Sequence, residues 1–552
     1  MATSEDIVGQ VLDRFSQAQS DRAIFAQHWD DVARVVLPYY ENTFFQNTLY
    51  TPGQERGLEM FDATANTALF RFAAAMESML TPRNGKWHGI RIADPDLNRK
   101  RNVRLWCDQV TDIMFHYRYA TNSGYQAQQH DGYVGMGAFG TCSLFVDRLR
   151  EPTNPGARGL RYRNIPLPEL FISEDHQGNV DTNIRRFRLS RRAIAQRWKA
   201  LPQGFAAKME KASDELVWIV HYTGPRANWQ PNALAGKVMP FACQYVLEDD
   251  KFLLEDSGYV SNPYATARYL TAPGEMYGRS PAMNVLPAIK GLNQQKKTFL
   301  KTMHRAADPV LLAHDDGIMD GLDLRPGALN FGGISAEGRR LVDTLPVGNP
   351  VATKESMDDE RQTINDAFLV TLFQILVETP QMTATEVLER AREKGALLSP
   401  TMGRYQSEGH GTQIRREFDV LYGQGLIPPM PPELEEASRA GVGWLVEFDA
   451  PLNRAMRAEE ASGIQRSIQF AAEIATQTQD PSVMDQFNFD EIIPSVAEIS
   501  GAPARFMNSP EVVMAKRQAR AQQQQAQQAI DAGPSMAAMM KAAAPEGNSL
   551  GG

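Results

Sequence analysis

Two glycine motifs in this sequence have the residue types that bind phosphates in nucleotide-binding proteins. The first, GMGAFG at Gly135–Gly140, matches the dinucleotide fingerprint G-x-G-x-x-G letter for letter. That fingerprint binds a pyrophosphate only when a strand precedes it and a helix follows, because the amino end of the helix must face the phosphates. Here a helical pattern precedes the motif, the strand-like TCSLFVDR follows it, and no acid stands about 20 residues further on to bind a ribose. We therefore predict a tight helix-to-strand turn at this motif.

The second motif, GEMYGRS at Gly274–Ser280, is similar to the phosphate-binding loop of nucleoside triphosphatases. Only three residues separate its glycines, where that loop has four, and Arg279 stands where the loop requires lysine. No apolar strand leads into it. Ser280 and Pro281 are instead typical of the N-cap and the first turn of a helix. We predict a turn that begins a helix.

The other reactive residue types do not form a catalytic or metal-binding pattern. HDDGIMDGLD at His314–Asp323 gathers acids but lacks the alternating ligands and the final glutamate of a calcium loop. The three cysteines, Cys107, Cys142 and Cys243, have no short spacing that would indicate a disulfide framework or a zinc site. The nine histidines are scattered, and the chain has no HExxH and no GxSxG motif. We predict no catalytic residue, no cofactor and no metal, and hence a protein that is not an enzyme.

A cationic stretch follows the second glycine motif. Lys296, Lys297, Lys301 and Arg305 lie along a predicted helix that runs to about residue 305. Apolar residues recur on this helix at helical spacing, but Lys296 interrupts the stripe, and Pro287 should kink the helix or move its start downstream. A helix that is polar on all sides needs water or a partner. The four cations form either a solvated face or a surface in contact with DNA or a neighbouring subunit.

The whole chain has the composition of a folded protein with several domains. It has 552 residues, of which 43% are hydrophobic and 22% charged, and a single core stops growing well below that length. The net charge of −9 argues against tight non-specific DNA binding by the whole chain, because proteins that neutralise phosphates are usually basic. No apolar run approaches about 18 residues, so we expect no membrane-spanning helix and no membrane partner. The acidic N-terminal stretch is unlike a signal peptide, and the cysteine usage fits a reducing cytoplasm.

The spacing of apolar residues predicts an α+β fold that is mainly helical. Helices are predicted at 4–36, 58–80, 97–119 and 123–134, and strands at 87–92, 142–147, 160–165, 185–189 and 216–222. The cationic helix follows, then a turn-rich stretch at 308–353 and a second long helix at about 355–376. A strand at 444–451 and a helix at 453–478 come later, and the Gln/Ala-rich tail is a marginal helix on its own. Two long helices therefore bracket a compact insert.

Several stretches together resemble the head-to-tail connector, or portal, protein family of short-tailed (T7-like, podovirus) bacteriophages. They are HWDDVARVVLP (28–38), FDATANTALFRFAAAMESMLTP (61–82) followed by KWHGI (86–90), GEMYGRSPAMNVLPAIKGLN (274–293), ETPQMTATEVLERAREKG (378–395) and VEFDAPLNRAMRAEE (446–460). They occur in the family's order and cover the chain from about residue 20 to about residue 480. No single motif is decisive, but their order is specific.

The resemblance implies a phage portal fold, assembled as a ring of about twelve copies at a unique capsid vertex. The implied segments are the N-terminal part of a wing (1–277), stem helix 1 (278–306), a clip (307–354), stem helix 2 (355–377), a tunnel loop (378–384), the C-terminal part of the wing (385–452), a crown (453–505) and a C-terminal tail or helical barrel (506–552).

The resemblance also implies site residues, partners and a location. Lys296, Lys297, Lys301 and Arg305 would line the channel. The tunnel loop would include Glu378, Thr379, Pro380, Gln381, Met382 and Thr383, and the clip would dock terminase or tail proteins through Asp320, Asp323, Arg325, Arg339 and Arg340. Double-stranded DNA would pass during packaging and ejection without sequence-specific binding. Further partners would be scaffolding and major capsid proteins and tail adaptor or nozzle proteins, in a virion component assembled in the host cytoplasm.

Two other classes of protein stay open at this point. One is a different virion structural protein, such as a tail adaptor or an internal core protein, although those lack the helix–insert–helix arrangement. The other is a nucleotide-binding enzyme that uses GMGAFG, against which the reversed order of helix and strand already counts.

Overall fold

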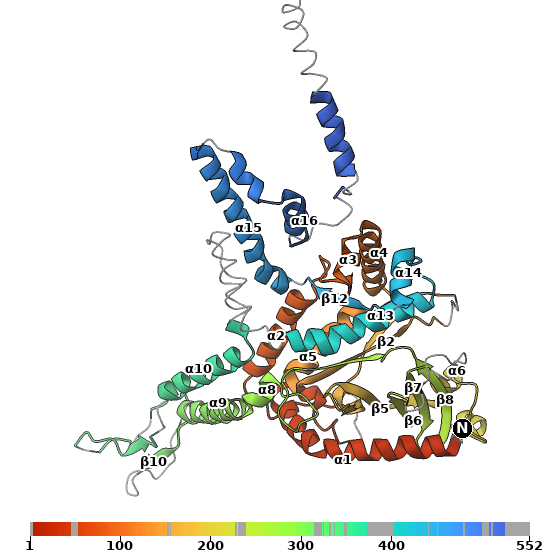
Figure 1. The fold of residues 1–552 in the computed structure, drawn as a ribbon. Helices are drawn as coiled ribbons and strands as arrows, with labels where there is room; N and C mark the ends of the chain where they lie inside the picture. The colour runs from red at the N-terminus through yellow and green to blue at the C-terminus, as the bar shows by residue number, and fades with distance from the viewer. Residues whose placement is uncertain are drawn as a thin grey trace, which may run out of the picture. The chain divides into compact units, whose positions relative to one another are not determined.

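The chain is described by a computed structural model over residues 4–45, 53–151, 154, 156–226, 229, 239–313, 323, 325–329, 333–335, 337–346, 350–371, 402–439, 441–449, 451–478, 481–499, 507–508 and 512–524. Its helices and sheets are mixed, as the sequence predicts (Figure 1). The chain divides into two compact units. The first comprises Met1–His88, Asp112–Ile427 and Phe448–Met456, and the second comprises Gly89–Thr111, Pro428–Glu447 and Arg457–Gly552.

The first unit contains most of the strands. Its helical elements are α1 (Ser4–Val36), η1 (Pro38–Tyr40), α2 (Thr64–Leu80), α5 (Tyr125–Phe139), η2 (Leu167–Glu169), α6 (Arg191–Arg197), α7 (Phe205–Lys211), α8 (Pro281–Asn284), α9 (Leu286–Ala307), α10 (Pro350–Ala367), the π-helical turn η3 (Gln406–His410) and α13 (Gly411–Gly423). Its strands are β2 (Thr141–Arg148), β3 (Leu160–Asn164), β4 (Leu170–Glu174), β5 (Val180–Ser190), β6 (Leu216–Thr223), β7 (Phe241–Leu247), β8 (Phe252–Tyr259), β9 (Tyr264–Arg268), β10 (Leu311–Ala313) and β11 (Val342–Thr344).

Five antiparallel strands form the larger sheet, in the order β4-β5-β6-β7-β8. Side chains alternate between the two faces of a strand, so each face can carry its own apolar cluster. The helix α1 covers one face, where Phe15 meets Phe171 edge to face with ring centroids 5.0 Å apart. The short helices α6 and α7 cover the other face through Ile194, Trp198 and Phe205.

The smaller sheet has the order β3-β2-β9 and connects to the largest core. In its register, Phe145 on β2 lies opposite Arg163 on β3 and Tyr264 on β9. The helix α5 packs against β2 and β3, α2 packs against α5, and the core around them includes the fully buried Trp29 and Phe72. This core also receives the first turns of α9 and part of α10, so it positions both long helices.

The predicted helix–insert–helix arrangement is present in the first unit. The helices α9 and α10 pack side by side, and the strands β10 and β11 pair antiparallel between them in sequence (Figure 1). The short strands follow the prediction of small strands and turns in this stretch.

The sequence predicts one continuous helix over 355–376, and this prediction is wrong because the helix is interrupted. The helix α10 starts earlier, at Pro350, and ends at Ala367, and Leu369 then has a left-handed φ of 59°. Residues two apart on a straight helix point to different sides. The interruption lets both Phe368 and Val370 enter the core, where they are 0% and 2% exposed, and this burial offsets the backbone cost at Leu369.

The second unit is mainly helical. Its elements, some of which begin or end at its boundary, are β1 (His88–Ile92), α3 (Pro95–Arg99), α4 (Arg101–Arg118), α14 (Pro432–Arg439), β12 (Trp444–Phe448), α15 (Pro451–Thr478), η4 (Pro481–Gln486) and α16 (Phe489–Ile499), and residues 512–524 are also helical. The strands β1 and β12 pair, which joins two segments far apart in the chain. The single helix predicted at 97–119 is divided, because α3 is capped by Asp94 and Lys100 has extended backbone angles.

Candidate functional site

The first glycine motif is the end of a helix, and the turn is shorter than predicted. The helix α5 continues through GMGAF to Phe139, and only Gly140, with a left-handed φ of 78°, turns the chain into β2. Gly137 lies where α5 packs against α2, and a Cβ there would overlap the side chains of Leu69 and Phe72. The glycines therefore allow close helix packing and a helix C-cap.

The second glycine motif packs directly against the first. A Cβ at Gly140 would overlap the carbonyl oxygen of Gly278, and a Cβ at Gly278 would overlap that of Gly140. The Gly278 amide donates to Thr141 Oγ1 at 2.9 Å, and the Gly140 carbonyl accepts from the Tyr269 amide at 2.9 Å. Ser280 Oγ donates to the carbonyl of Ala138 at 2.8 Å. The Gly140 amide donates to the Met136 carbonyl at 2.9 Å and the Arg279 amide to the Leu270 carbonyl at 2.7 Å. These amides and that of Gly278 are thus bound within the protein and do not face a phosphate, which counts against the nucleotide-binding interpretation of both motifs.

The start of the cationic helix agrees with the local signals in the sequence. Ser280 accepts a hydrogen bond from the Met283 amide at 2.9 Å and caps α8, whose first residue is Pro281. After four residues Val285 interrupts the helix, and Pro287 then occupies the first turn of α9. A proline is tolerated at that position because its missing amide hydrogen would have no partner there.

Asn293 fixes α9 to the segment before α2. It is 8% exposed, and its side-chain oxygen accepts from the amides of Phe61 and Asp62 at 2.8 and 2.9 Å. Its side-chain nitrogen donates to the carbonyl of Glu59 at 2.6 Å. Asn293, which lies three residues before the first lysine of the cationic stretch, is therefore a buried structural tether.

A second polar contact joins α10 to the same segment. Arg361 Nη2 lies 2.7 Å from Asp62 Oδ2, and Asp62 Oδ1 accepts from the Thr64 amide at 2.9 Å at the start of α2. Burial alone would raise the pKa of Asp62, but the hydrogen bonds from Thr64 and Arg361 lower its pKa overall. Both long helices are thus held to the amino end of α2.

The four predicted channel residues lie on α9 beyond its buried turns. Lys296 and Lys297 are half-buried, with ammonium groups 5.6 Å from the Phe299 ring centroid and 5.2 Å from the Phe61 ring centroid. Lys301 and Arg305 are exposed. Lys297, Lys301 and Arg305 are spaced four residues apart, so they share one face of the helix. This face can offer three positive charges to a ligand or to solvent.

The described residues of the predicted docking site lie in the insert between α9 and α10. Asp323 and Arg325 approach to 3.7 Å, and Arg325 is 88% exposed. Arg339 and Arg340 are exposed on a small turn in which the Ser335 amide donates to the Arg339 carbonyl at 2.8 Å. Asp320 and most of the acidic stretch at His314–Asp323 lie outside the described residues, as do all the predicted tunnel-loop residues from Glu378 to Thr383.

Within the described part of the chain, no group of three or more His, Cys, Asp or Glu side chains is arranged to hold a metal ion. The three cysteines are unpaired and buried, and burial raises the pKa of Cys107 and Cys243 to about 11 and that of Cys142 to about 12. Thiols in such surroundings are unreactive. No helix in the described residues is long and apolar enough to cross a membrane.

Sequence reasoning missed a buried ion pair between Arg118 and Glu417, which are both 0% exposed. Glu417 also accepts from the Tyr162 hydroxyl at 2.8 Å and from Gln413 at 2.7 Å, and Arg118 donates to His88 Nε2 at 2.7 Å. The two charged residues are 299 positions apart, and each is indistinguishable from a surface charge in the sequence. No local signal could have paired them.

Comparisons with known proteins agree over nearly the whole chain. Residues 8–507 match the model of a family described as bacteriophage head to tail connecting protein. The probable portal protein of Bordetella phage BPP-1 is 27% identical over 532 residues, which are 94% of this chain and 92% of that protein. The portal protein of Salmonella phage epsilon15 is 24% identical over 537 residues, which are 96% of this chain and 94% of that protein. A solved chain from the virion of a native gene transfer agent particle is 12% identical with a TM-score of 0.31, covering 72% of this chain and 88% of that one, which is too low to support an argument about fold.

Proposed function

Because the chain belongs to the bacteriophage head-to-tail connecting protein family, the family of phage portal proteins, we propose that about twelve copies form a ring around a DNA channel. The observation that carries the proposal is the family match across residues 8–507. Portal proteins are structural components of the virion, and the match also removes the tail adaptor and internal core alternatives. We place the ring at a unique capsid vertex and its assembly in the host cytoplasm.

The packing of the first unit supports assigning family segments to this chain. The paired helices α9 and α10 fit the two stem helices at 278–306 and 355–377, and the β10–β11 insert fits the clip at 307–354. The wing would comprise 1–277 and 385–452, the tunnel loop 378–384, the crown 453–505 and the tail or barrel 506–552.

The far half of α9 is the part best suited to face a channel and a neighbouring copy. Leu300 and Met303 are 39% and 43% exposed on the same turns as Lys301 and Arg305. An exposed face that mixes apolar and cationic residues is stabilised when a neighbour covers the apolar groups and water reaches the charges. We propose Lys296, Lys297, Lys301 and Arg305 as channel-lining residues on this basis.

The charge of the assembly would favour passage of DNA without tight binding. About twelve chains of net charge −9 sum to roughly −108, and such a wall repels phosphates over about 10 Å in ordinary salt. Rings of lysine on α9 would offer only weak contacts that salt screens. Duplex DNA would therefore move through the channel in both packaging and ejection.

The exposed clip residues are proposed as the docking surface for terminase and later for tail adaptor or nozzle proteins. Arg325, Arg339 and Arg340 present cations, and Asp323 lies beside Arg325. Scaffolding and major capsid proteins would contact the wing side. Energy for packaging would come from the docked motor, because the contact between Gly140 and Gly278 occupies both motifs that could have bound a nucleotide. Purified protein should therefore hydrolyse no ATP, and turnover that co-purifies with it over several columns would contradict this.

Negative-stain images and native mass measurement of the purified protein test the ring directly. Annular particles with a mass of about twelve chains are expected. A protein that stays monomeric at high concentration would refute the proposal.

The triple variant Lys297→Gln, Lys301→Gln and Arg305→Gln tests the channel face, with the exposed Lys354→Gln on α10 as a matched control. We expect rings from both variants, and altered packaging or ejection only from the triple variant. If the triple variant loses ring formation, but DNA passes normally through the particles that still form, the assignment of these residues to the channel wall would be overturned.

A further inference from the structure

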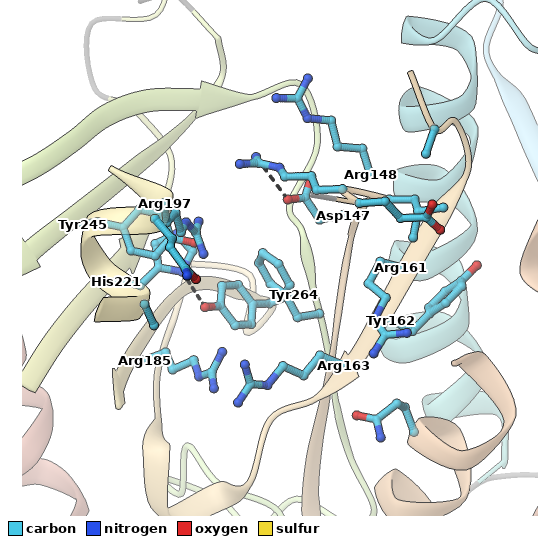
Figure 2. A pocket seen from close by; sticks show the side chains of 18 of the residues that line it. Asp147, Arg148, Arg161, Tyr162, Arg163, Arg185, Arg197, His221, Tyr245 and Tyr264 are labelled. Carbon is cyan, nitrogen blue, oxygen red and sulfur yellow. Dashed lines mark hydrogen bonds and ion pairs between the residues drawn. The ribbon is translucent and has the colours of Figure 1, made fainter. Parts of the chain in front are cut away.

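The described part of the first unit contains a pocket of about 1240 Å³ between its five-stranded and three-stranded sheets, which we call the arginine pocket. Seven arginines line it, on β2, β3, β5, α6 and the β2–β3 connection, and it has no lysine. Figure 2 shows Arg148, Arg161 and Arg163 on one wall and Arg185 and Arg197 on the other. On β3 the exposed Arg161 and Arg163 flank the buried Tyr162.

The charges of the arginine pocket are not balanced within it. Its acidic lining residues are Asp147 and Glu151, so cations exceed anions by five in a chain whose net charge is −9. Three of the arginines have partners other than these: Arg185 is bound by Glu169 at 2.7 and 2.9 Å, Arg161 donates to the Asn122 carbonyl at 2.9 Å, and Arg197 lies over the Tyr245 ring.

Three other arginines have no carboxylate within ion-pair distance among the residues that the structure describes. Among the described residues, Arg148, Arg158 and Arg163 form no ion pair, and all three are exposed to the pocket or its mouth. Burial lowers the pKa of Arg163 most, the neighbouring Arg185 lowers it further, and Glu169 raises it in part. Repulsion between the guanidiniums of Arg163 and Arg185 is therefore one part of this shift. An anion bound between the two walls would relieve this repulsion.

The arginine pocket is poorly suited to nucleic acid. Single strands bind by stacking their bases on exposed aromatic faces. Here Tyr245 is already stacked on His221 with ring centroids 4.0 Å apart, and Tyr264 Oη lies 2.6 Å from His221 Nδ1. Tyr245, Tyr264 and His221 are at most 3% exposed, so the groups that a ligand can reach are mainly guanidiniums.

The size and the spread of charge also disfavour a small anion. Pockets for small molecules are about 300–1,000 Å³, and this one is larger. In Figure 2 Arg163 and Arg185 point toward each other, whereas Arg148, Arg161 and Arg197 lie elsewhere along the walls, so the cations are spread along the pocket. A ligand with several anionic groups along an extended chain would match them, and guanidinium forks bind carboxylates through two parallel hydrogen bonds.

We propose that the arginine pocket binds an acidic peptide segment of a partner protein, whose carboxylates pair with Arg148, Arg158 and Arg163. The inference rests on this chain's own surface and does not depend on ring formation. It adds to the virion protein a site for a partner on the wing side, separate from the clip.

A labelled oligoglutamate peptide provides the test, by fluorescence anisotropy with the full-length protein at low and physiological salt. Unlabelled oligoglutamine, inorganic triphosphate and single-stranded DNA serve as competitors. We expect oligoglutamate to bind and to be displaced weakly or not at all by these competitors. Absence of oligoglutamate binding, or tighter binding of triphosphate or DNA, would overturn the proposal.

The double variant Arg148→Gln with Arg163→Gln should weaken oligoglutamate binding by at least about tenfold, since it removes two charge-assisted contacts. Arg83→Gln, at an exposed arginine outside the pocket, is the matched control and should leave affinity within about twofold. Urea midpoints for all variants exclude unfolding as the cause. Equal weakening by the control would show a non-specific charge effect and refute the site. If oligoglutamate binding disappears when the protein is assembled into rings, a neighbouring copy of the chain occupies the pocket. That result would refute the proposal that a separate partner protein binds there.

Discussion

Alanine at Gly140 should destabilise the first unit through two effects that can be measured separately. Gly140 has a φ of 78°, where an L side chain costs about 1–2 kcal/mol. A Cβ at Gly140 would also overlap the carbonyl oxygen of Gly278, and such overpacking costs about 1–3 kcal/mol. Gly140→Ala should therefore lower the free energy of unfolding by about 2–5 kcal/mol.

Two other glycines isolate the two effects. Gly204 has the same φ of 78° with open space around its Cβ position, so Gly204→Ala should lose only the backbone cost of about 1–2 kcal/mol. Gly278 has no left-handed φ, so Gly278→Ala should lose only the cost of the overlap, about 1–3 kcal/mol. Each change from glycine to alanine also restricts the unfolded chain by a similar amount, so this contribution cancels in the differences.

Equilibrium unfolding in urea, followed by tryptophan fluorescence, measures these losses. Trp29 is one of the seven tryptophans that contribute to this signal, and its ring meets Tyr277 edge to face at 5.0 Å, next to Gly278. The urea dependence of the free energy must stay constant across the variants for the comparison to hold. If Gly140→Ala proves no more destabilising than Gly204→Ala, the close contact between the two glycine motifs is refuted.

Three further predictions concern buried polar groups. Glu417→Gln leaves Arg118 buried without its carboxylate and should cost about 3–5 kcal/mol in urea unfolding, whereas Arg118→Met combined with Glu417→Leu should cost less; equal losses would contradict this. Burial and the guanidinium of Arg118 lower the pKa of His410 to about 3. As the pH falls below about 6.5, His410 is therefore protonated in the unfolded chain but stays neutral in the folded chain. The contribution of His410 to the free energy of unfolding is therefore fully present above about pH 6.5 and falls by about 2 kcal/mol at pH 5. The variant His410→Phe should flatten the pH profile of the urea midpoint. An unchanged profile would refute His410 as the source of this pH dependence. The pKa of Asp62 is lowered by Thr64 and by the guanidinium on α10, so its contribution is present above about pH 4 and lost as the pH falls further; Asp62→Asn should reduce the difference between the urea midpoints at pH 5 and pH 3, and an identical difference would count against it.

The start of α9 shows what a sequence can predict well. Ser280, Pro281 and Pro287 act within one or two helical turns, so their effects on capping and on the helix start need no knowledge of the rest of the fold. The helix–insert–helix arrangement was predicted on the same grounds, from helical spacing on both sides of a stretch rich in Gly and Pro. The four cations on α9 follow directly from that helix, although their role stays a prediction.

Long-range packing explains what the sequence could not predict. The interruption of the helix at Leu369 is compensated only because Phe368 reaches the core around Phe72. The ring centroids of Phe368 and Phe72 are 6.3 Å apart. The strands β4, β7, β8 and β9 were not predicted; of these, β9 pairs with β2, which is distant in sequence, whereas β4, β7 and β8 pair with strands next to them in the chain. The arginine pocket likewise forms only when β3 and β5, on different sheets, face each other.

The glycine motifs show why a matching pattern of letters was a poor guide here. A phosphate loop and a close contact between two backbone segments both require residues without a Cβ, so both select glycine. The difference lies in where the backbone groups point. In a nucleotide site the amides face the ligand, whereas here the Gly278 amide donates to Thr141 and the Gly140 amide donates to the Met136 carbonyl. In the sequence, the order of helix and strand around GMGAFG indicated this difference. The strand β2 begins directly after Gly140, and its backbone pairs with the strand β9. Glycine content alone could not have distinguished the two.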